Sequence, residues 1–339
     1  MEARTTWQRP LLLPINIYQV RKRVVAIQLI IPGMEPLIIV FGSIALDIVQ
    51  SVPRLPRPGE TMLTADYVML PGGKGANQAL AAARAGGDVS FAASIGGDDF
   101  GRRALTNLEL AGIDLSGIIE QTRPTACATI SVDSSGENQI VVSSGANLET
   151  TADQLEPEAG DFVLQQMEIP LAEVWRGIEC AKANNAKCIL NAAPFQPIPP
   201  KFLRKLDVLI VNEIEAQMLA DSLDLRGEEL SSVCAQIQDR YDITVVLTLG
   251  ANGALAFSNE ERLQVNALPV RAIDTVGAGD AFVGAFVAAM SRQFTLDECM
   301  AWGTVAGGLA CTKPGAQDGI PEATAIRARL DEIQVSQLS

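Results

Sequence analysis

Leu37-Ile38-Ile39-Val40-Phe41-Gly42-Ser43-Ile44 is the stretch that decides the fold. Its side chains are apolar without interruption until two small residues, Gly42 and Ser43, break the run. A strand with one wet face alternates apolar and polar residues, whereas a continuous apolar run is typical of a strand buried on both faces. We therefore expect an inner strand of a parallel sheet that helices cover on both sides.

Strands and helices alternate along the rest of the chain. The side-chain patterns predict further strands over residues 89–95, 162–167, 188–192, 208–211 and 244–249. They predict helices over residues 76–85, 101–111, 171–184, 213–219 and 227–240. This alternation predicts an α/β fold with a doubly wound, mostly parallel sheet and helices on both faces. Asp47, Asn212 and Gly250 each come shortly after a predicted strand, so we expect them to meet at the carboxyl edge of the sheet, where such folds bind ligands.

Two segments do not follow the alternation. Residues 47–70 are rich in Pro and Gly, and residues 126–142 have the pattern of a hairpin with a polar turn at 134–138. Apolar residues gather on one face of the first hairpin strand, at positions 126, 128, 130 and 132. A small sheet with one apolar face needs something to cover; the alternative is an edge hairpin packed on the body.

The most informative motif is Asp274-Thr275-Val276-Gly277-Ala278-Gly279-Asp280, which an apolar helical pattern follows at once. Such a run can leave bare backbone N–H groups at a helix N-terminus, which is a ready site for anions. A carboxylate beside that site suits a general base that deprotonates a hydroxyl attacking a phosphate. In the alternative interpretation, Asp280 is only the N-cap of a helix after a tight turn.

A second glycine run, Pro71-Gly72-Gly73-Lys74-Gly75-Ala76-Asn77-Gln78-Ala79, also leads into a helix and carries a cation and an amide at its start. It matches neither the phosphate-binding P-loop nor G-x-G-x-x-G. Between the two runs lie Asn212-Glu213-Ile214-Glu215 and Thr248-Leu249-Gly250. Asn212 and Glu215 also fit an N-cap and its capping-box partner.

These four motifs, in this order, resemble the signatures of the ribokinase (PfkB) family of carbohydrate kinases, and the likeness runs from about Leu37 to about Leu330. The resemblance implies a ribokinase-like domain over residues 37–335, with segments at about 48–70 and 124–143 forming a β-sheet lid over the sugar. It implies a cytoplasmic enzyme that moves the γ-phosphate of ATP to the 5-hydroxyl of ribose. It further implies Mg²⁺ and K⁺ as cofactors, and a homodimer formed through the lid.

The resemblance also assigns roles to residues at matching positions. Asp280 is the expected general base, and the expected anion hole is formed by the amides of Gly277, Ala278 and Gly279. The expected sugar ligands are Asp47, Gly73, Lys74, Asn77 and Glu168. Nucleotide and magnesium positions are Asn212, Glu215, Thr248, Gly250, Asn252 and Gly253. A potassium-like ion would lie, mostly through backbone carbonyls, at Asp274, Val276, Ala310, Lys313, Gly315 and Gly319.

One position departs from the family pattern. Ribokinases usually have Gly-Ser-Ile-Asn-x-Asp after the first strand, whereas this chain has Gly42-Ser43-Ile44-Ala45-Leu46-Asp47. A methyl group thus replaces an amide that would contact the sugar. The change weakens ribose binding or marks another substrate, such as 2-deoxyribose, fructose or a nucleoside. A nucleoside kinase would need aromatic rings, and the lid segments offer only Tyr67; a non-catalytic sugar sensor would not need an intact Asp280.

Composition excludes several classes of function. A net charge of −14 argues against a nucleic-acid partner, because phosphate backbones need a basic face. The chain has no histidine, which removes Ser-His-Asp catalysis and imidazole proton shuttles. Its six cysteines are scattered without a C-x-x-C pair, so we expect buried reduced thiols.

Residues 1–36 differ from the remainder. They hold five basic and two acidic residues, against 21 basic and 38 acidic in the rest of the chain. The apolar run at 24–31 is far shorter than the roughly 20 residues of a membrane helix, so no membrane partner is expected. We expect an N-terminal extension outside the fold, with Met34 as the natural start; an organelle transit peptide is the alternative.

Overall fold

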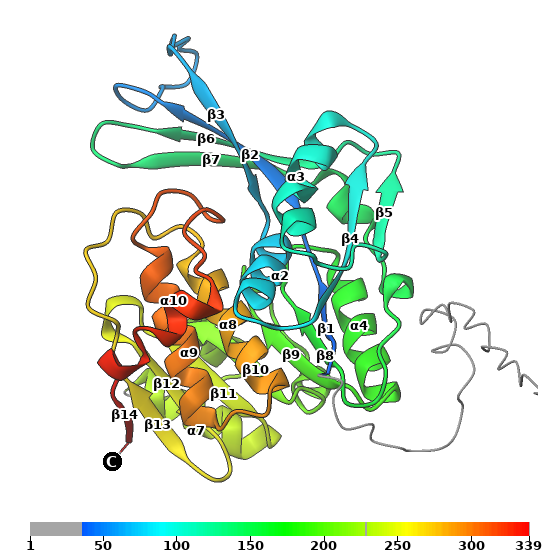
Figure 1. Cartoon of the computed structure of the whole chain (residues 1–339), viewed down its shortest axis with the longest axis vertical. Coiled ribbons are helices and arrows are strands. Elements are labelled where there is room, and N and C mark those ends of the chain that lie inside the picture. Colours follow the sequence, from blue (N-terminus) through cyan, green and yellow to red (C-terminus); the bar gives the residue numbers. More distant parts are fainter. Residues whose placement is uncertain (1–35, 228, 339) are drawn as a thin grey trace, which may run out of the picture. The chain divides into compact units, whose positions relative to one another are not determined.

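The main sheet runs in the order β14-β13-β12-β11-β10-β9-β8-β1-β4-β5 in the computed structural model, which describes residues 36–227 and 229–338 (Figure 1). Seven neighbouring strands are parallel: β1 (Ile38–Phe41), β4 (Val89–Gly96), β5 (Ile118–Gln121), β8 (Phe162–Gln165), β9 (Lys187–Asn191), β10 (Val208–Asn212) and β11 (Thr244–Thr248). Three antiparallel strands extend one edge: β12 (Ala254–Phe257), β13 (Arg262–Val265) and β14 (Val335–Gln337). The predicted mostly parallel sheet is confirmed.

Helices cover both faces of this sheet (Figure 1). Those packed in one hydrophobic core are α2 (Lys74–Arg84), α3 (Asp99–Leu110), α8 (Ala278–Ser291), α9 (Leu296–Ala310) and α10 (Ala323–Arg327). Those in the other core are α4 (Leu171–Ala183), α5 (Pro200–Leu203), α6 (Glu213–Ser222) and α7 (Leu230–Tyr241). Short 3₁₀ helices are η1 (Gly145–Glu149), η2 (Ala152–Gln154), η3 (Gly250–Asn252) and η4 (Leu330–Glu332).

Strand β1 shows why its sequence lacks alternation. Ile38 and Val40 point into one hydrophobic core, and Ile39 and Phe41 point into the other. All four side chains are at most 4% exposed. Successive strand residues face opposite sides of a sheet, so both sides must be apolar when helices cover both.

A second sheet has the order β3-β2-β6-β7 and projects from the body (Figure 1). Its strands are β2 (Ala45–Ser51), β3 (Tyr67–Gly72), β6 (Ala126–Val132) and β7 (Asn138–Ser143). The predicted hairpin is confirmed as β6 and β7. Strand β1 ends at Phe41 and strand β2 begins at Ala45. The prediction of one strand from residue 37 to residue 44 is therefore wrong over its last three residues. The chain leaves the body at Gly42-Ser43-Ile44, and Ser43 is held there because its carbonyl accepts from the Ala76 amide at 2.9 Å. We call this second sheet the lid sheet.

Several predicted boundaries also move. Helix α2 begins at Lys74 instead of 76, so the lysine belongs to the first helical turn. Strand β8 ends at Gln165, which places Gln166 beyond its carboxyl end. The lid strands begin at Ala45 and reach Gly72, slightly outside the predicted segment at 48–70. The predicted N-terminal extension lies outside the described residues, apart from Pro36.

Two further observations concern the described residues. All six cysteines are free thiols; Cys188, Cys234 and Cys299 are buried, and the other three are partly buried. Within the described part of the chain, helices long and apolar enough to span a bilayer are absent.

Candidate active site

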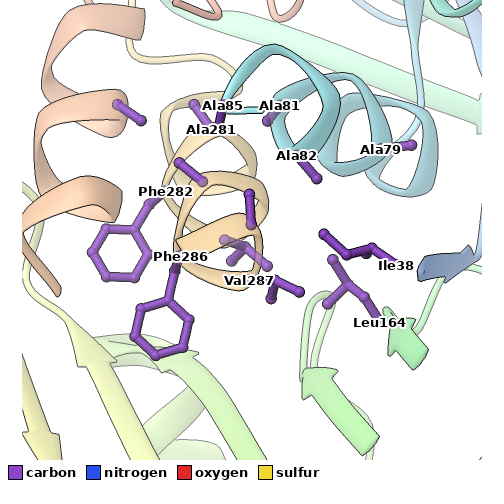
Figure 2. Close-up of a cluster of buried hydrophobic side chains, with 14 of the residues drawn as sticks. Ile38, Ala79, Ala81, Ala82, Ala85, Leu164, Ala281, Phe282, Phe286 and Val287 are labelled. Atoms are coloured by element: carbon purple, nitrogen blue, oxygen red, sulfur yellow. The ribbon is translucent and has the colours of Figure 1, made fainter. Parts of the chain in front are cut away.

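Helices α2 and α8 pack very closely, and their contact decides where the candidate base lies. Figure 2 shows Ala81 and Ala281 where the two helices face each other, with Phe282 and Phe286 on the side of α8 turned away from α2. A Cβ atom added at Gly284 would lie 2.5 Å from both Ala81 Cβ and the Gln78 carbonyl oxygen. The helices can approach this far only because position 284 has no side chain. We call this contact the α2–α8 seam.

Asp280 lies one turn before Gly284 and is 7% exposed. Its Oδ2 accepts a hydrogen bond from Asn77 Nδ2 at 3.1 Å, and its Oδ1 accepts one from Gln78 Nε2 at 2.8 Å. The N-cap of α8 is Gly277, so the interpretation of Asp280 as the N-cap is wrong. Two neutral donors instead hold the carboxylate in one orientation, because a buried carboxylate needs hydrogen-bond partners.

The residues of the predicted anion hole lie at the N-terminus of α8. Gly277 has φ 77°, and a Cβ there would lie 2.6 Å from the Ala316 carbonyl oxygen. A Cβ added at Gly279 would meet nothing within 4 Å, so there is open space beside the second helical residue. The helix N-terminus directs N–H groups and a partial positive charge towards its end. The predicted glycine-alanine-glycine turn is therefore present and accessible.

The predicted sugar ligands come together where the lid sheet joins the body. Glu168 Oε2 accepts from the Lys74 backbone amide at 3.0 Å and from Ser43 Oγ at 2.5 Å. A Cβ added at Gly72 would lie 2.5 Å from Asp47 Oδ2. Burial, reinforced by the charge of Glu168, raises the pKa of Asp47 to about 6. Two carboxylates thus share a partly desolvated region, which is costly unless a ligand uses them.

Lys74 interacts electrostatically with a predicted sugar ligand, Glu168, and with a predicted nucleotide residue, Glu215. Its pKa is raised chiefly by the charge of Asp280, while burial acts in the opposite direction. Glu168 and Glu215 add to the rise. One ammonium group therefore lies in the field of three carboxylates that come from three different elements. Its charge offsets the repulsion that would otherwise oppose a phosphate in this acidic protein.

The predicted nucleotide residues follow adjacent strands. Asn212 ends β10 and stands in register with Thr248, which ends β11. Asn212 Oδ1 accepts from the Glu215 amide and Glu215 Oε2 accepts from the Asn212 amide, both at 2.9 Å. The capping-box interpretation of this pair is therefore correct. Burial raises the pKa of Glu215, while the Asn212 amide and Lys74 act against it.

The loop after β11 continues through η3. Gly250 has φ 54° and Gly253 has φ 89°, and a Cβ at Gly253 would lie 1.9 Å from the Val265 carbonyl oxygen. Only glycine fits at position 253. Gly250 and Asn252 are exposed at the carboxyl edge of the sheet, as expected for a ligand-binding loop.

The residues predicted to hold a potassium-like ion form two contacts. Asp274 Oδ1 accepts from the Val276 amide at 3.0 Å, and its Oδ2 accepts from the Gly315 amide at 2.8 Å. A Cβ at Gly319 would lie 2.4 Å from the Ala310 carbonyl oxygen. Lys313 is exposed. Among the described residues, groups of three or more His, Cys, Asp or Glu side chains that could hold a metal are absent, so any ion here would depend on carbonyl oxygens.

The sequence did not reveal a group of buried side-chain amides, most of which are linked by hydrogen bonds to Asp280 or Asn77. The members are Gln78, Gln166, Asn191, Gln317 and Asn147. Asn147 pairs with both the amide and the carbonyl of Ile44, at 3.1 and 3.0 Å, and so fixes the entry to the lid sheet. The available signal was an amide at position 78 inside an otherwise apolar helical pattern, because buried amides require partners.

The chain is similar to known carbohydrate kinases over most of its length. A family model described as pfkB family carbohydrate kinase matches residues 35–323. A ribokinase of Haemophilus influenzae is 38% identical over 295 residues, which cover 85% of this chain and 96% of that protein. A ribokinase structure from Thermotoga maritima has a TM-score of 0.81 and 32% identity, covering 88% of this chain and 100% of that one. A structure of Arabidopsis thaliana ribokinase complexed with ribose and ATP has a TM-score of 0.78 and 29% identity, covering 87% and 98%.

Proposed function

This chain belongs to the pfkB family of carbohydrate kinases, enzymes that transfer a phosphoryl group to an alcohol, and we propose that it transfers the γ-phosphate of ATP to the 5-hydroxyl of ribose. The single observation that carries the proposal is the double amide clamp on Asp280 beside the open first turn of α8. The relatives named above as ribokinases, one of them complexed with ribose and ATP, support the substrates.

The reaction follows from the positions of these groups. Asp280 accepts the proton of the sugar hydroxyl as the hydroxyl oxygen bonds to the γ-phosphorus, and the bond from that phosphorus to the ADP oxygen breaks. The amides of Gly277, Ala278 and Gly279 stabilise negative charge on the moving phosphoryl group. Lys74 and the N-terminus of α8 supply the positive field. Each carboxylate oxygen of Asp280 accepts one amide bond, so each retains a lone pair for the substrate.

In this proposal, the residues where the lid sheet joins the body select the sugar. Asp47 and Glu168 accept from sugar hydroxyls, while Asn77 and the Gly73–Lys74 backbone complete the pocket. Ala45 follows Ile44 at the start of β2 and carries no hydrogen-bonding side chain. This residue favours a second candidate substrate, a pentose that lacks one hydroxyl, such as 2-deoxyribose.

Magnesium and a potassium-like ion fit the donor chemistry of the site. Glu215 and Asn212 would hold Mg²⁺ through water, and the bound ion supplies charge neutralisation for the β- and γ-phosphates. Asp274 and the carbonyls near Gly315 and Gly319 offer the hard oxygen ligands that K⁺ takes, and such an ion would order the loop before α8. ATP as substrate and six free cysteines fit a cytoplasmic location.

A homodimer through the lid sheet completes the proposal. The strand register places Val68, Ile140 and Val142 on the same face as Asp47. Their side chains are 57%, 50% and 62% exposed. A contiguous apolar face of this kind is typical of an interaction surface, and a second lid sheet would cover it. Light scattering of the wild type and of Ile140→Asp tests this, since the charge should produce monomers.

The experiment that tests the function is an ADP-release assay with ATP and a panel of acceptors: ribose, 2-deoxyribose, fructose and several nucleosides. Ribose should give the highest kcat/KM, and nucleosides should give little activity. A higher kcat/KM for 2-deoxyribose would transfer the assignment to the second candidate. ATP turnover with no acceptor in the panel would contradict the proposed function.

A further inference from the structure

Gln78 is a fully buried polar residue at the α2–α8 seam, with an exposed fraction of 0%. It lies on α2 among alanine and leucine residues that pack in the core. Burying a side-chain amide in such surroundings is unfavourable unless its donors and acceptor are bonded. The chain places one here where an apolar residue of similar size would pack without that requirement.

Every hydrogen-bonding group of the Gln78 amide is used inside the protein. The two N–H groups of Nε2 reach Asp280 Oδ1 at 2.8 Å and Asn191 Oδ1 at 2.9 Å. The carbonyl oxygen Oε1 accepts from Gln166 Nε2 at 2.7 Å. Both N–H groups of the amide are therefore occupied and its oxygen is bonded to Gln166; because the side chain is also 0% exposed, we place Gln78 outside the sugar pocket.

These partners fix which end of the amide faces the base. Gln166 donates to Oε1, so the oxygen is held on the side of β8, and the donor is turned to Asp280. Asn191 ends β9 and is itself held by its own Nδ2, which donates to the Ile210 carbonyl of β10 at 3.1 Å. A continuous chain of hydrogen bonds thus links Gln166, just beyond β8, Asn191 at the end of β9 and the Ile210 carbonyl of β10 to one oxygen of Asp280.

Asn77 makes the matching bond to the other oxygen but differs in kind. Its Oδ1 accepts from Gln317 Nε2 at 3.0 Å and its Nδ2 donates to Asp280, which leaves one N–H group. Asn77 can therefore bind sugar and base together. Gln78 can act only on the base.

We propose that Gln78, oriented by Gln166 and Asn191, is a positioning residue that holds Asp280 in the rotamer needed to take the proton from the sugar hydroxyl. The inference rests on the proposed function, because it assumes that Asp280 is the base. A base misplaced by about 1 Å can lose about 100-fold in rate. Gln78 does not contact the substrate in this proposal. Replacing Gln78 should therefore lower kcat and leave KM unchanged.

The test compares Gln78→Leu with Gln238→Leu. Gln238 is a matched control, because it is 3% exposed and its Nε2 donates to Asn259 in the turn between β12 and β13. It lies on α7, which packs in the other hydrophobic core from α8 and Asp280. We expect Gln78→Leu to lower kcat about 10- to 100-fold while KM for ribose and for ATP changes less than about threefold. Gln238→Leu should lower the melting temperature but keep kcat. Equal kcat values in the two variants would overturn the proposal.

A double variant tests whether the effect passes through Asp280. In an Asp280→Asn background, Gln78→Leu should lower kcat by less than about twofold, since residues that act as a unit are not additive. The same fold-loss in both backgrounds would overturn the proposal. If Asp280→Asn alone keeps its activity, Asp280 is not the base and the inference is overturned while the kinase function stands. ATP turnover with no acceptor in the panel would instead contradict the proposed function, so the two failures are distinguished.

A second variant decides the matter if Gln78→Leu does not fold. Gln166→Leu leaves Gln78 in place but removes the donor that orients its amide. We expect kcat to fall about three- to tenfold, because the amide can then turn its oxygen towards Asp280. A folded Gln166→Leu protein with wild-type kcat would overturn the proposal.

Discussion

The α2–α8 seam and the lid sheet place their functional groups in opposite environments. In the seam, Asp280 is buried and clamped by two amides, and the helices touch through a glycine. In the lid sheet, Asp47 is only partly buried and all six residues of β7 are exposed. The difference indicates a division of labour. Under the proposed function, the seam would fix the geometry of phosphoryl transfer, whereas the lid sheet would capture the sugar.

We expect the largest effect from Asp280→Asn, which changes only the proposed proton acceptor of the seam. Asp280→Asn keeps the shape of the side chain but cannot accept a proton, and general-base catalysis is worth about 10²–10⁴-fold. We expect kcat in the ADP-release assay to fall by at least this range, with KM for ATP nearly unchanged. A variant that keeps more than about a tenth of the wild-type kcat would remove Asp280 from the role of base.

Asp47→Asn should weaken the proposed binding of ribose at the lid sheet. Hydrogen bonds to charged groups contribute about 1.5–3 kcal/mol, so KM for ribose should rise about 10- to 150-fold with little change in kcat at saturation. In the wild type, kcat/KM for ribose should fall as the pH drops through about 6, where Asp47 takes up a proton. The Asp47→Asn profile should lack this step. A step that persists in the variant would assign it to another group.

The same substitution also has an expected effect on stability. The folded-state pKa of Asp47 lies above its ordinary value, so the folded state binds more protons between about pH 4 and 6. Stability contributed by Asp47 is therefore present at low pH and lost as the pH rises through about 6. Asp47→Asn removes this cost and should raise the melting temperature at pH 7, by an amount corresponding to at most about 3 kcal/mol. A lower melting temperature of the variant at pH 7 would contradict a raised pKa of Asp47 in the folded state.

Gly284→Ala should separate the two helices of the seam. The new methyl group would lie 2.5 Å from Ala81 Cβ, and overpacking of this kind costs about 1–3 kcal/mol. Unfolding in urea should show the loss, and kcat should fall because the amide donors withdraw from Asp280. Gly136→Ala, in the lid turn, is the control: it has positive φ but open space around it, so kcat should not change. Loss of kcat in the lid variant instead would contradict the division of labour.

We expect the smallest effect from Ala45→Asn, which tests whether the lid sheet selects the sugar. Ala45→Asn should add one hydrogen bond to a sugar hydroxyl and raise kcat/KM for ribose by about 0.5–1.5 kcal/mol, roughly 2- to 13-fold. A sugar lacking the contacted hydroxyl should gain nothing. A ribose value that falls on introducing Asn would contradict a ribokinase-like pocket and leave the chemistry at Asp280 untouched.

The sequence predicted the features that depend on local pattern. The apolar run at β1 predicts burial on both faces, and the two glycine runs predict helices that begin near Lys74 and Asp280, although α2 begins two residues earlier than predicted. The sequence also predicts the β6–β7 hairpin of the lid sheet, because apolar and polar residues alternate along its first strand and a polar turn follows. The ends of elements were less predictable, as at Phe41, where β1 ends because the Ser43 backbone pairs with the Ala76 amide.

The sequence could not predict the amide network. Gln78 and Asn191 are 113 residues apart, and Gln317 lies 240 residues from Asn77. Hydrogen bonds between residues so far apart in sequence depend on how helices, strands and loops pack in three dimensions, which local sequence patterns do not encode. The capping box at Asn212 was open to two interpretations because a magnesium ligand and a helix cap use the same residue types.

Ribose titration of Asp280→Asn and Asp47→Asn by calorimetry tests the central claim most directly. If the seam performs chemistry and the lid sheet captures sugar, the Asp280→Asn protein binds ribose within about threefold of wild type, and the Asp47→Asn protein binds it at least about tenfold more weakly. Equal losses of ribose affinity in the two variants would contradict the account.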